Sequence, residues 1–298
     1  MHLVAMRHPT ICALLAMGFF AVCGCGSDQQ IGTDGGRSEP GTTATPAPAT
    51  LTFATYNVLV DPTRADERLP SLLKVLGDSN ADVIALQEVT PWFAERLLSE
   101  EWARGYHTTL GEPREGAPGG LAILSRLPIK KQEYRPLTSR QGRGVLVVRL
   151  KAADRSLAVA TVHLESPLQA GEARARQLGE ILPLFAGADD AVLLGDFNFG
   201  DGEEPETGRL PAAFVDLWRA LRPDQPGLTW NIEKSAMAHD GSFPGEKSRR
   251  LDRILVRSAF WAPKDVRIVG DAPVKPGDAG LFPSDHFGLV GTVGTINQ

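Results

Sequence analysis

Short apolar runs that end in a polar residue recur along the chain and constrain its fold more than any other feature. Four of these runs end at or near Asn57, Glu88, His163 and Asp196. Runs of this length, rich in β-forming residues, predict buried strands. Because the ends of rigid strands are where a scaffold holds catalytic groups in fixed positions, we expect these polar residues to belong to a site.

Helical patterns lie between the predicted strands and indicate an α/β fold. Leucines spaced by three and four residues over 69–76 predict an amphipathic helix, and Pro91 is placed to begin a second one. Further helices are expected over 170–185, where Pro183 should end or kink the helix, and over 210–221. Many strands of mixed length favour two packed sheets covered by helices, although the spacing also fits one open α/β sheet. The strands are predicted over residues 51–58, 81–89, 119–125, 145–150, 157–164, 191–198, 250–256 and 289–295.

The first 50 residues have the pattern of an export signal followed by a tether. The apolar stretch over 11–22 is shorter than the roughly 20 residues of a membrane-spanning helix. Gly24 precedes Cys25 as a small residue precedes the lipidated cysteine in bacterial lipoprotein signals, which residues 1–25 resemble. We therefore expect lipid on Cys25 and an exported protein anchored to the cell envelope, with ordinary cleavage and periplasmic or secreted release as the alternative. Residues 26–50 contain no aromatic residue and are expected to be a disordered linker.

Residues 51–298 are long enough for one large α/β domain, which we expect to be monomeric. The whole chain of 298 residues is 42% hydrophobic and 22% charged, as is usual for globular proteins. Beyond residue 50 there are 29 basic and 33 acidic side chains. A domain that grips duplex nucleic acid through its phosphates usually has an excess of basic residues, so the charge argues against that function. All three cysteines fall in the first 25 residues, so the domain does not depend on disulfides.

The polar residues at the predicted strand ends suit metal-assisted chemistry on a phosphate ester. Glu88 and Asp285 offer hard oxygen ligands of the kind that Mg²⁺ or Mn²⁺ prefers. His286, next to Asp285, could stabilise the charge that builds on phosphate oxygens. Asp196 could take a proton from the attacking water, and Asn198 could position that water without repelling it. The domain has no cysteine and no His-x-x-x-His pair, which argues against a zinc protease site.

Two of the candidate residues could have either a functional or a purely structural role. Asp252 could orient His286 through a ring nitrogen, or it could only form ion pairs with Arg250 and Arg253. Trp230 could belong to the core, or it could be a platform on which a base stacks.

Taken together, the motifs resemble those of the endonuclease/exonuclease/phosphatase superfamily, in the order that the family has them and over about 230 residues. The resemblance implies a DNase I-like four-layer α/β sandwich that hydrolyses phosphoesters with Mg²⁺ or Mn²⁺. The motifs are Thr55-Tyr56-Asn57-Val58, Leu86-Gln87-Glu88-Val89, Thr161-Val162-His163-Leu164-Glu165-Ser166, Gly195-Asp196-Phe197-Asn198, Arg250-Leu251-Asp252-Arg253-Ile254 and Ser284-Asp285-His286-Phe287-Gly288.

The resemblance also implies a role for each matching residue. Glu88 is then the metal ligand, with Asn57 and Asp285 near the same ion. His286 contacts the phosphate with Asp252 behind it, and His163 binds a phosphate oxygen. Asp196 and Asn198 position the water.

Within the superfamily, the motifs are most similar to those of tyrosyl-DNA phosphodiesterases, which release a tyrosine from a 5′ DNA phosphate. This similarity implies single-stranded DNA ends as substrates, with Trp230, Arg143 and Ser284 as substrate-binding residues. One departure concerns Gly200, where that branch has an arginine. Hydrolysis of phospholipids, as by a sphingomyelinase, or of phosphomonoesters stays open as an alternative. So does a surface module that binds a ligand without catalysis.

Overall fold

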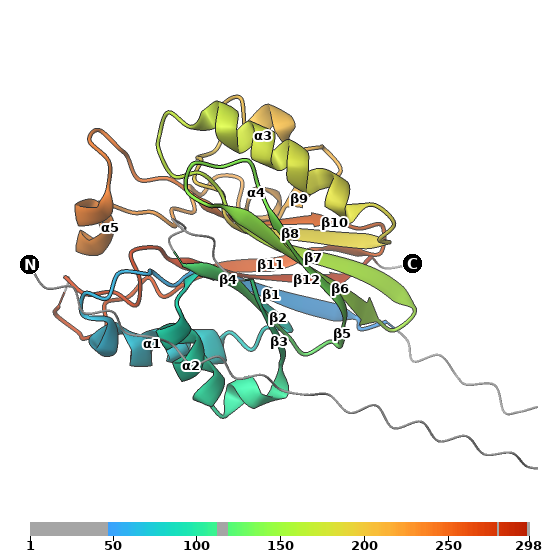
Figure 1. Cartoon of the computed structure of the whole chain (residues 1–298), viewed down its shortest axis with the longest axis horizontal. Coiled ribbons are helices and arrows are strands. Elements are labelled where there is room, and N and C mark those ends of the chain that lie inside the picture. The colour runs from blue at the N-terminus through green and yellow to red at the C-terminus, as the bar shows by residue number, and fades with distance from the viewer. Residues whose placement is uncertain (1–46, 112–118, 279, 297–298) are drawn as a thin grey trace, which may run out of the picture. The chain divides into compact units, whose positions relative to one another are not determined.

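The computed structural model describes residues 47–111, 119–278 and 280–296 (Figure 1). The predicted signal segment and Cys25 lie outside the described residues, as does most of the predicted linker. The description that follows concerns the domain from residue 47 onward.

Two six-stranded sheets form the centre of the domain. The first sheet has the strand order β11-β12-β1-β2-β4-β3, and the second has the order β5-β6-β7-β8-β10-β9. The strands of the first sheet are β1 (Thr50–Asn57), β2 (Val83–Val89), β3 (His107–Gly111), β4 (Gly120–Ser125), β11 (Trp261–Val269) and β12 (Gly288–Thr295). Those of the second are β5 (Ile129–Pro136), β6 (Gly144–Ala152), β7 (Arg155–His163), β8 (Asp190–Asp196), β9 (Val215–Asp216) and β10 (Asp252–Arg257).

Three of the described α-helices begin after a residue whose side chain caps them, namely Thr90, Asp216 and Ser235. Thr90 accepts a hydrogen bond from the backbone N–H of Phe93, with Pro91 in the first turn, which fixes the start of α2. The α-helices are α1 (Ala65–Asp78), α2 (Pro91–Ser99), α3 (Gly171–Ile181), α4 (Leu217–Leu221) and α5 (Ala236–Gly241). The 3₁₀ helices are η1 (Trp102–Gly105), η2 (Leu182–Phe185) and η3 (Thr207–Arg209).

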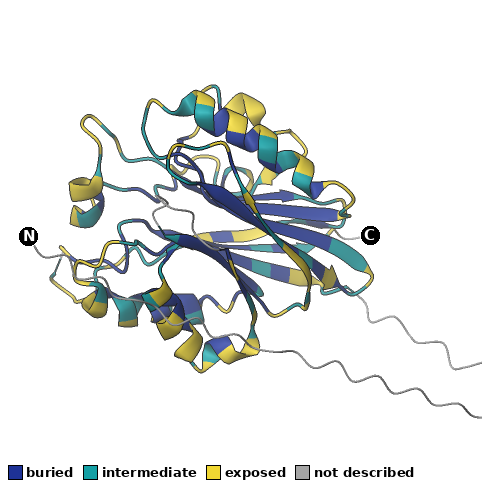
Figure 2. Ribbon diagram, viewed as in Figure 1, coloured by how far each residue is buried: buried dark blue, intermediate teal, exposed yellow. Residues whose placement is uncertain are grey.

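The domain has four layers, which are the two sheets and a layer of helices on the outer face of each (Figures 1 and 2). Apolar side chains pack on both faces of each sheet. Residues of the two inner faces, such as Phe53 and Val159, pack against one another between the sheets. Helices α1 and α2 cover the outer face of the first sheet and bury Leu72 and Phe93 there. Helix α3 covers the outer face of the second sheet and buries Leu178. The predicted four-layer α/β sandwich is therefore confirmed, and the open single sheet is wrong.

Strand pairing brings the polar strand ends to one edge of the two sheets. In the first sheet β1 runs parallel to β2, so that Asn57 pairs with Gln87, next to Glu88. In the second sheet β7 runs parallel to β8, and His163 pairs with Asp196. Strand β10 runs antiparallel to β8, which places its first residue, Asp252, opposite Asp196. The polar residues thus meet although they come from distant parts of the sequence.

The predicted helix over 210–221 is confirmed only over Leu217–Leu221, and several edge elements were not predicted. The carboxylate of Asp216 accepts hydrogen bonds from the N–H groups of Trp218 and Arg219, so α4 begins only after this residue. Strands β3, β5 and β11 lie at sheet edges and have partly exposed side chains, so they lack the apolar runs that identify central strands. Within the described part of the chain, no helix is long and apolar enough to cross a membrane.

Candidate active site

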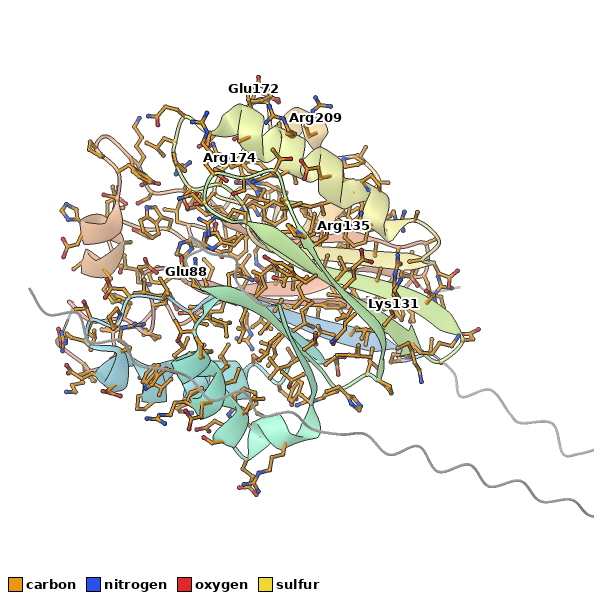
Figure 3. All side chains as sticks on the ribbon, in the orientation of Figure 1. Glu88, Lys131, Arg135, Glu172, Arg174 and Arg209 are labelled. Atoms are coloured by element: carbon orange, nitrogen blue, oxygen red, sulfur yellow. The ribbon has the colours of Figure 1, made fainter. Side chains whose placement is uncertain are left out.

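A cavity of about 260 Å³ lies at the edge of the sheets where the polar strand ends meet. In Figure 3, Glu88 lies between the layer of α1 and α2 and the layer of α3. Eight of the eleven domain residues that the sequence singled out line this cavity: Glu88, Arg143, His163, Asp196, Asn198, Trp230, Asp285 and His286. Asp252 and Asn57 do not line the cavity, but their side chains form hydrogen bonds with residues that do, His286 and Asp196.

His286 is held by a carboxylate at each side of its ring. Its Nδ1 lies 2.9 Å from Oδ2 of Asp252, and its Nε2 lies 3.6 Å from Oδ2 of Asp196. Burial alone would lower the pKa of His286, but the charges of Asp252 and Asp196 raise this pKa well above its usual value. The ring is therefore a cation with a hydrogen on each nitrogen, and its Nε2–H can donate to a phosphate oxygen.

The ion-pair alternative for Asp252 is not what the structure shows. Arg250 and Arg253 bond to Asp201 and Asp216 instead. The Asp252 side chain is fully buried, and its hydrogen bond to His286 leaves its other oxygen without a partner among the described residues. Because an isolated buried carboxylate is costly, the paired imidazolium stabilises it.

Asp196 is the residue on which the other groups converge. Its Oδ2 accepts a hydrogen bond from Nδ2 of Asn57 at 3.1 Å, and its Oδ1 accepts one from the N–H of Asn198 at 2.9 Å. Burial raises the pKa of Asp196, which makes the carboxylate a stronger base. Asn198 donates its Nδ2 to the carbonyl of Leu164, and its amide oxygen has no partner among the described residues, so this oxygen could hold a water.

Gly195 allows Asp196 to reach this position. Its φ is +139°, and a Cβ there would lie 2.1 Å from the carbonyl oxygen of Val162, so a side chain would push β8 away from β7.

His163 is neutral, in contrast to His286. Nη1 of Arg143 donates to Nδ1 of His163 at 2.8 Å, and since arginine is only a donor, the hydrogen of the imidazole is on Nε2. Burial and the charge of Arg143 lower the pKa of His163 well below its usual value. Its Nε2 lies 3.4 Å from Oδ2 of Asp196 and lines the cavity as a neutral donor. Arg143 was predicted to bind substrate, and its buried guanidinium also positions His163.

Glu88 and Asp285 fit the divalent metal that the sequence predicts. Both carboxylates line the cavity, and burial together with the charge of Asp285 raises the pKa of Glu88 to about 7. A cation between two such carboxylates would remove this repulsion, and an all-oxygen set suits Mg²⁺ or Mn²⁺. Glu88 is held in a left-handed conformation with φ of +62°, and the N–H of Val60 donates to its Oε2 at 2.7 Å. A strained residue fixed in this way is typical of a functional site.

Two further groups bear on the metal assignment. Asn57 was predicted to lie near the ion as a ligand, but its Nδ2 donates to Oε1 of Glu88 and to Asp196, and its oxygen accepts from the N–H of Leu59. Asn57 therefore positions the carboxylates in this structure. Asp196, Asp252 and His286 also have ligand atoms within 4.8 Å of one another. Because Asp252 already bonds to His286 Nδ1, Glu88 and Asp285, whose carboxylates line the cavity, are the candidate ligands.

Two of the predicted substrate contacts need correction. The hydroxyl of Ser284 is fully buried and donates to the carbonyl of Asn57 at 2.7 Å, so it fixes the backbone and does not face substrate. Trp230 is only 6% exposed and packs with Leu251, while its ring lies 4.9 Å from that of His286. This favours the core alternative, because a base needs an exposed ring face for stacking.

The sequence did not assign a role to Phe243 of the cavity or to Gln87 between the sheets. Phe243, on an irregular segment after α5, lines the cavity and is 41% exposed. Gln87 is buried between the sheets, where its Nε2 donates to the hydroxyls of Thr55 and Thr161. The sequence signal for Gln87 was the presence of a polar amide side chain in an otherwise apolar strand. Nothing in the local sequence distinguishes Phe243 from other loop aromatics.

Comparison with known proteins identifies relatives over most of the domain. The model of a family described as "Endonuclease/Exonuclease/phosphatase family" matches residues 54–286. Tyrosyl-DNA phosphodiesterase 2 of Mus musculus is 28% identical over 256 residues, which are 83% of this chain and 67% of that protein. The protein of the same name from Xenopus laevis is 30% identical over 251 residues, which are 80% of this chain and 65% of that protein. The chain thus spans about two thirds of the length of these relatives.

Solved structures agree with the fold. The structure of D. rerio TDP2 complexed with a single-strand DNA product has a TM-score of 0.72 at 25% identity, and the match covers 83% of this chain and all of that one. The human Nocturnin catalytic domain has the same fold, with a TM-score of 0.63 at 19% identity, and the match covers 83% of this chain and 95% of that one. The predicted resemblance to this superfamily, and to tyrosyl-DNA phosphodiesterases within it, is confirmed.

Proposed function

Because the chain belongs to the Endonuclease/Exonuclease/phosphatase family and is a metal-dependent phosphodiesterase, we propose that it hydrolyses 5′ ends of single-stranded DNA that carry a tyrosine. The observation that carries this proposal is one cavity lined both by His286, which is paired with Asp252, and by the carboxylates of Glu88 and Asp285. The curated relatives are named tyrosyl-DNA phosphodiesterase 2, and one solved neighbour holds a single-strand DNA product.

Each residue has a part in the reaction that follows from its contacts. A divalent cation held by Glu88 and Asp285 would act as a Lewis acid toward a phosphate oxygen. The protonated His286 donates from Nε2 to a second phosphate oxygen, and the neutral His163 can donate to a third. Asp196 accepts a proton from the attacking water, which Asn198 positions. Asn57 holds Asp196 and Glu88 at a fixed separation throughout.

The chemistry of the tyrosyl leaving group matches this set of residues. A phenol has a pKa near 10, so its oxygen leaves as an anion more readily than an alkoxide and needs little protonation. Transition-state charge then falls mainly on the phosphate oxygens, where the cation and His286 act. None of the roles given above protonates the leaving group, so this set of residues is suited to aryl esters.

The arginine of the tyrosyl-DNA phosphodiesterase motif is replaced by Gly200, which lies beside the carboxylate of Glu203, the partner of Arg249. Gly200 offers no guanidinium to a phosphate. We therefore expect a lower efficiency on DNA ends than the resemblance alone implies.

The experiment is a substrate panel in Mg²⁺. A single-stranded oligonucleotide with a 5′-phosphotyrosyl end should be cleaved faster than the same end within a duplex, than sphingomyelin and than p-nitrophenyl phosphate. Preferred hydrolysis of sphingomyelin or of the phosphomonoester, with no release of tyrosine from the oligonucleotide, would overturn the proposal in favour of the lipid or phosphatase alternative.

A further inference from the structure

A second cavity, of about 560 Å³, adjoins the candidate active site between the loop over residues 138–140 and helix α3. Arg140 lies on the loop side of this cavity and Arg176 on the helix side, while Glu165 and Pro167 form part of its wall. None of the functions assigned above uses this cavity.

The two cavities lie on consecutive residues of the same two segments. Gln141 and Ser166 line the active-site cavity, and their neighbours Arg140 and Pro167 line the second one. The segments are fixed to each other, because Oε1 of Gln141 accepts from the N–H of Ser166 at 2.8 Å and Arg143 bonds to both side chains. A linear substrate bound at the active site could extend along these two segments toward the second cavity.

The second cavity is lined by two arginines that form no ion pair with the two glutamates of its lining. The guanidinium groups of Arg140 and Arg176 are exposed and have no hydrogen-bond or ion-pair partner among the described residues. The carboxylate of Glu165 is buried and bonded to Ser139, to the N–H of Arg140 and to Gln177. The remaining acidic residue of the lining is Glu172, near the start of α3 (Figure 3).

From this arrangement we propose that Arg140 and Arg176 form a second anionic subsite, which holds a phosphate of a nucleic-acid strand next to the scissile one. The inference rests on the proposed function and deepens it, because it makes the preferred substrate an oligonucleotide with at least two phosphates. Arginine pairs well with phosphate through its planar fork of donors. The subsite also supplies the strand contact that Gly200 cannot make.

The test measures how an unmodified single-stranded oligonucleotide inhibits hydrolysis of a small chromogenic phosphodiester by the full chain in Mg²⁺. The double variant Arg140→Gln/Arg176→Gln should raise the inhibition constant of the oligonucleotide by about 10-fold more than it raises KM for the chromogenic substrate. The slope of the logarithm of this constant against the logarithm of salt concentration should fall by about 0.7 to 1.4, since each lost phosphate contact contributes about 0.7 for a single strand.

Two further variants make the result specific to the cavity. Arg104→Gln/Lys131→Gln removes two exposed cationic side chains that line neither cavity and should leave the inhibition constant and its salt slope unchanged. Glu172→Gln removes the exposed carboxylate from the second cavity and should lower the inhibition constant.

The inference is overturned if the oligonucleotide does not inhibit the wild type, or if Arg140→Gln/Arg176→Gln behaves as the control pair does. It is also overturned if the double variant raises the inhibition constant of the oligonucleotide and KM for the chromogenic substrate by the same factor. These outcomes are separate from failure of the proposed function, because the inhibiting oligonucleotide carries no tyrosine and need not be cleaved.

Discussion

At the residue scale, the two histidines of the site show how contacts set opposite protonation states. His286 lies between the carboxylates of Asp252 and Asp196, which raise its pKa, whereas His163 accepts a hydrogen bond from Arg143, which with burial lowers its pKa. One imidazole is therefore a cationic donor and the other a neutral donor. Each state depends on the charge of a neighbouring side chain.

The contact between Asp252 and His286 gives the first prediction. Asp252→Asn should slow turnover of a small phosphodiester by about 10² to 10⁴-fold, because the amide cannot stabilise the imidazolium in the same orientation. Steady-state kinetics give the rate, and circular dichroism with thermal unfolding shows whether the variant stays folded. A folded variant with the wild-type rate would rule out the role of the pair.

The second prediction distinguishes the two aromatic residues of the cavity. Phe243 is the exposed one, and stacking of a base on an aromatic ring contributes about 1 to 3 kcal/mol, so Phe243→Ala should lower kcat/KM for an oligonucleotide by roughly 5 to 150-fold. The small chromogenic substrate should change much less. Trp230→Ala should instead impair both substrates alike and destabilise the fold by about 3 to 5 kcal/mol, since it opens a cavity beside His286. The opposite pattern would return the stacking role to Trp230.

At the scale of elements, the sequence predicts the central strands and their polar ends but not the edges or the irregular segments. Central strands are long apolar runs, so Asn57, Glu88, His163 and Asp196 could be placed at strand ends without coordinates. Edge strands such as β5 are half exposed and lack that pattern. The residues alone left the partner of Asp252 open between His286 and the flanking arginines, because that choice depends on where Asp201 and Asp216 lie in space. The family resemblance implied His286, and the structure agrees.

The carboxylate of Asp201 joins three elements and gives the third prediction. It bonds to Arg219 of α4, to Arg250 and to Arg253 of β10. Asp201→Asn should lower the free energy of unfolding by about 3 kcal/mol near pH 7, because it leaves buried guanidinium groups with one anion fewer. Chemical denaturation of the two proteins at the same pH measures this difference.

The difference in free energy of unfolding between the wild type and Asp201→Asn should become smaller at acidic pH. Burial opposes ionisation of Asp201, but hydrogen bonds from Arg219 and Arg250 and the charge of Arg253 hold its pKa far below the usual range in the folded protein. The unfolded value is about 3.9. The ionised carboxylate therefore stabilises the fold above about pH 4, and the advantage over Asp201→Asn should shrink as the pH falls further. A difference that grows on acidification would contradict this account.

At the scale of the whole molecule, the two sheets bring residues from most of the domain's length to one edge, and hydrogen bonds between the sheets hold that edge together. Asn57 of the first sheet bonds to Asp196 of the second, and Gln87 of the first bonds to Thr161 of the second. The site therefore depends on correct packing of both sheets. Length and the order of motifs could predict this architecture, because the family arranges the same motifs on it.

The place of the domain in the cell gives the fourth prediction. We propose that Cys25 is lipidated after export, since Gly24 supplies the small preceding residue, and that the following segment tethers the domain to the cell envelope. Mass spectrometry of the membrane fraction should find diacylglycerol on Cys25, and Cys25→Ser should move the protein to the soluble fraction. A wild type that is soluble and unmodified would contradict the anchor.

The most direct test of the central claim is the dependence of tyrosine release on the metal and on Glu88. The wild-type chain should release tyrosine from a 5′-phosphotyrosyl oligonucleotide in Mg²⁺ and should lose this activity in excess chelator, with recovery when Mg²⁺ is restored. Glu88→Gln should reduce the rate by at least about 100-fold at saturating Mg²⁺ while the protein stays folded. An undiminished rate after exhaustive chelation, or a Glu88→Gln variant as fast as the wild type, would contradict a metal-dependent phosphodiesterase centred on Glu88.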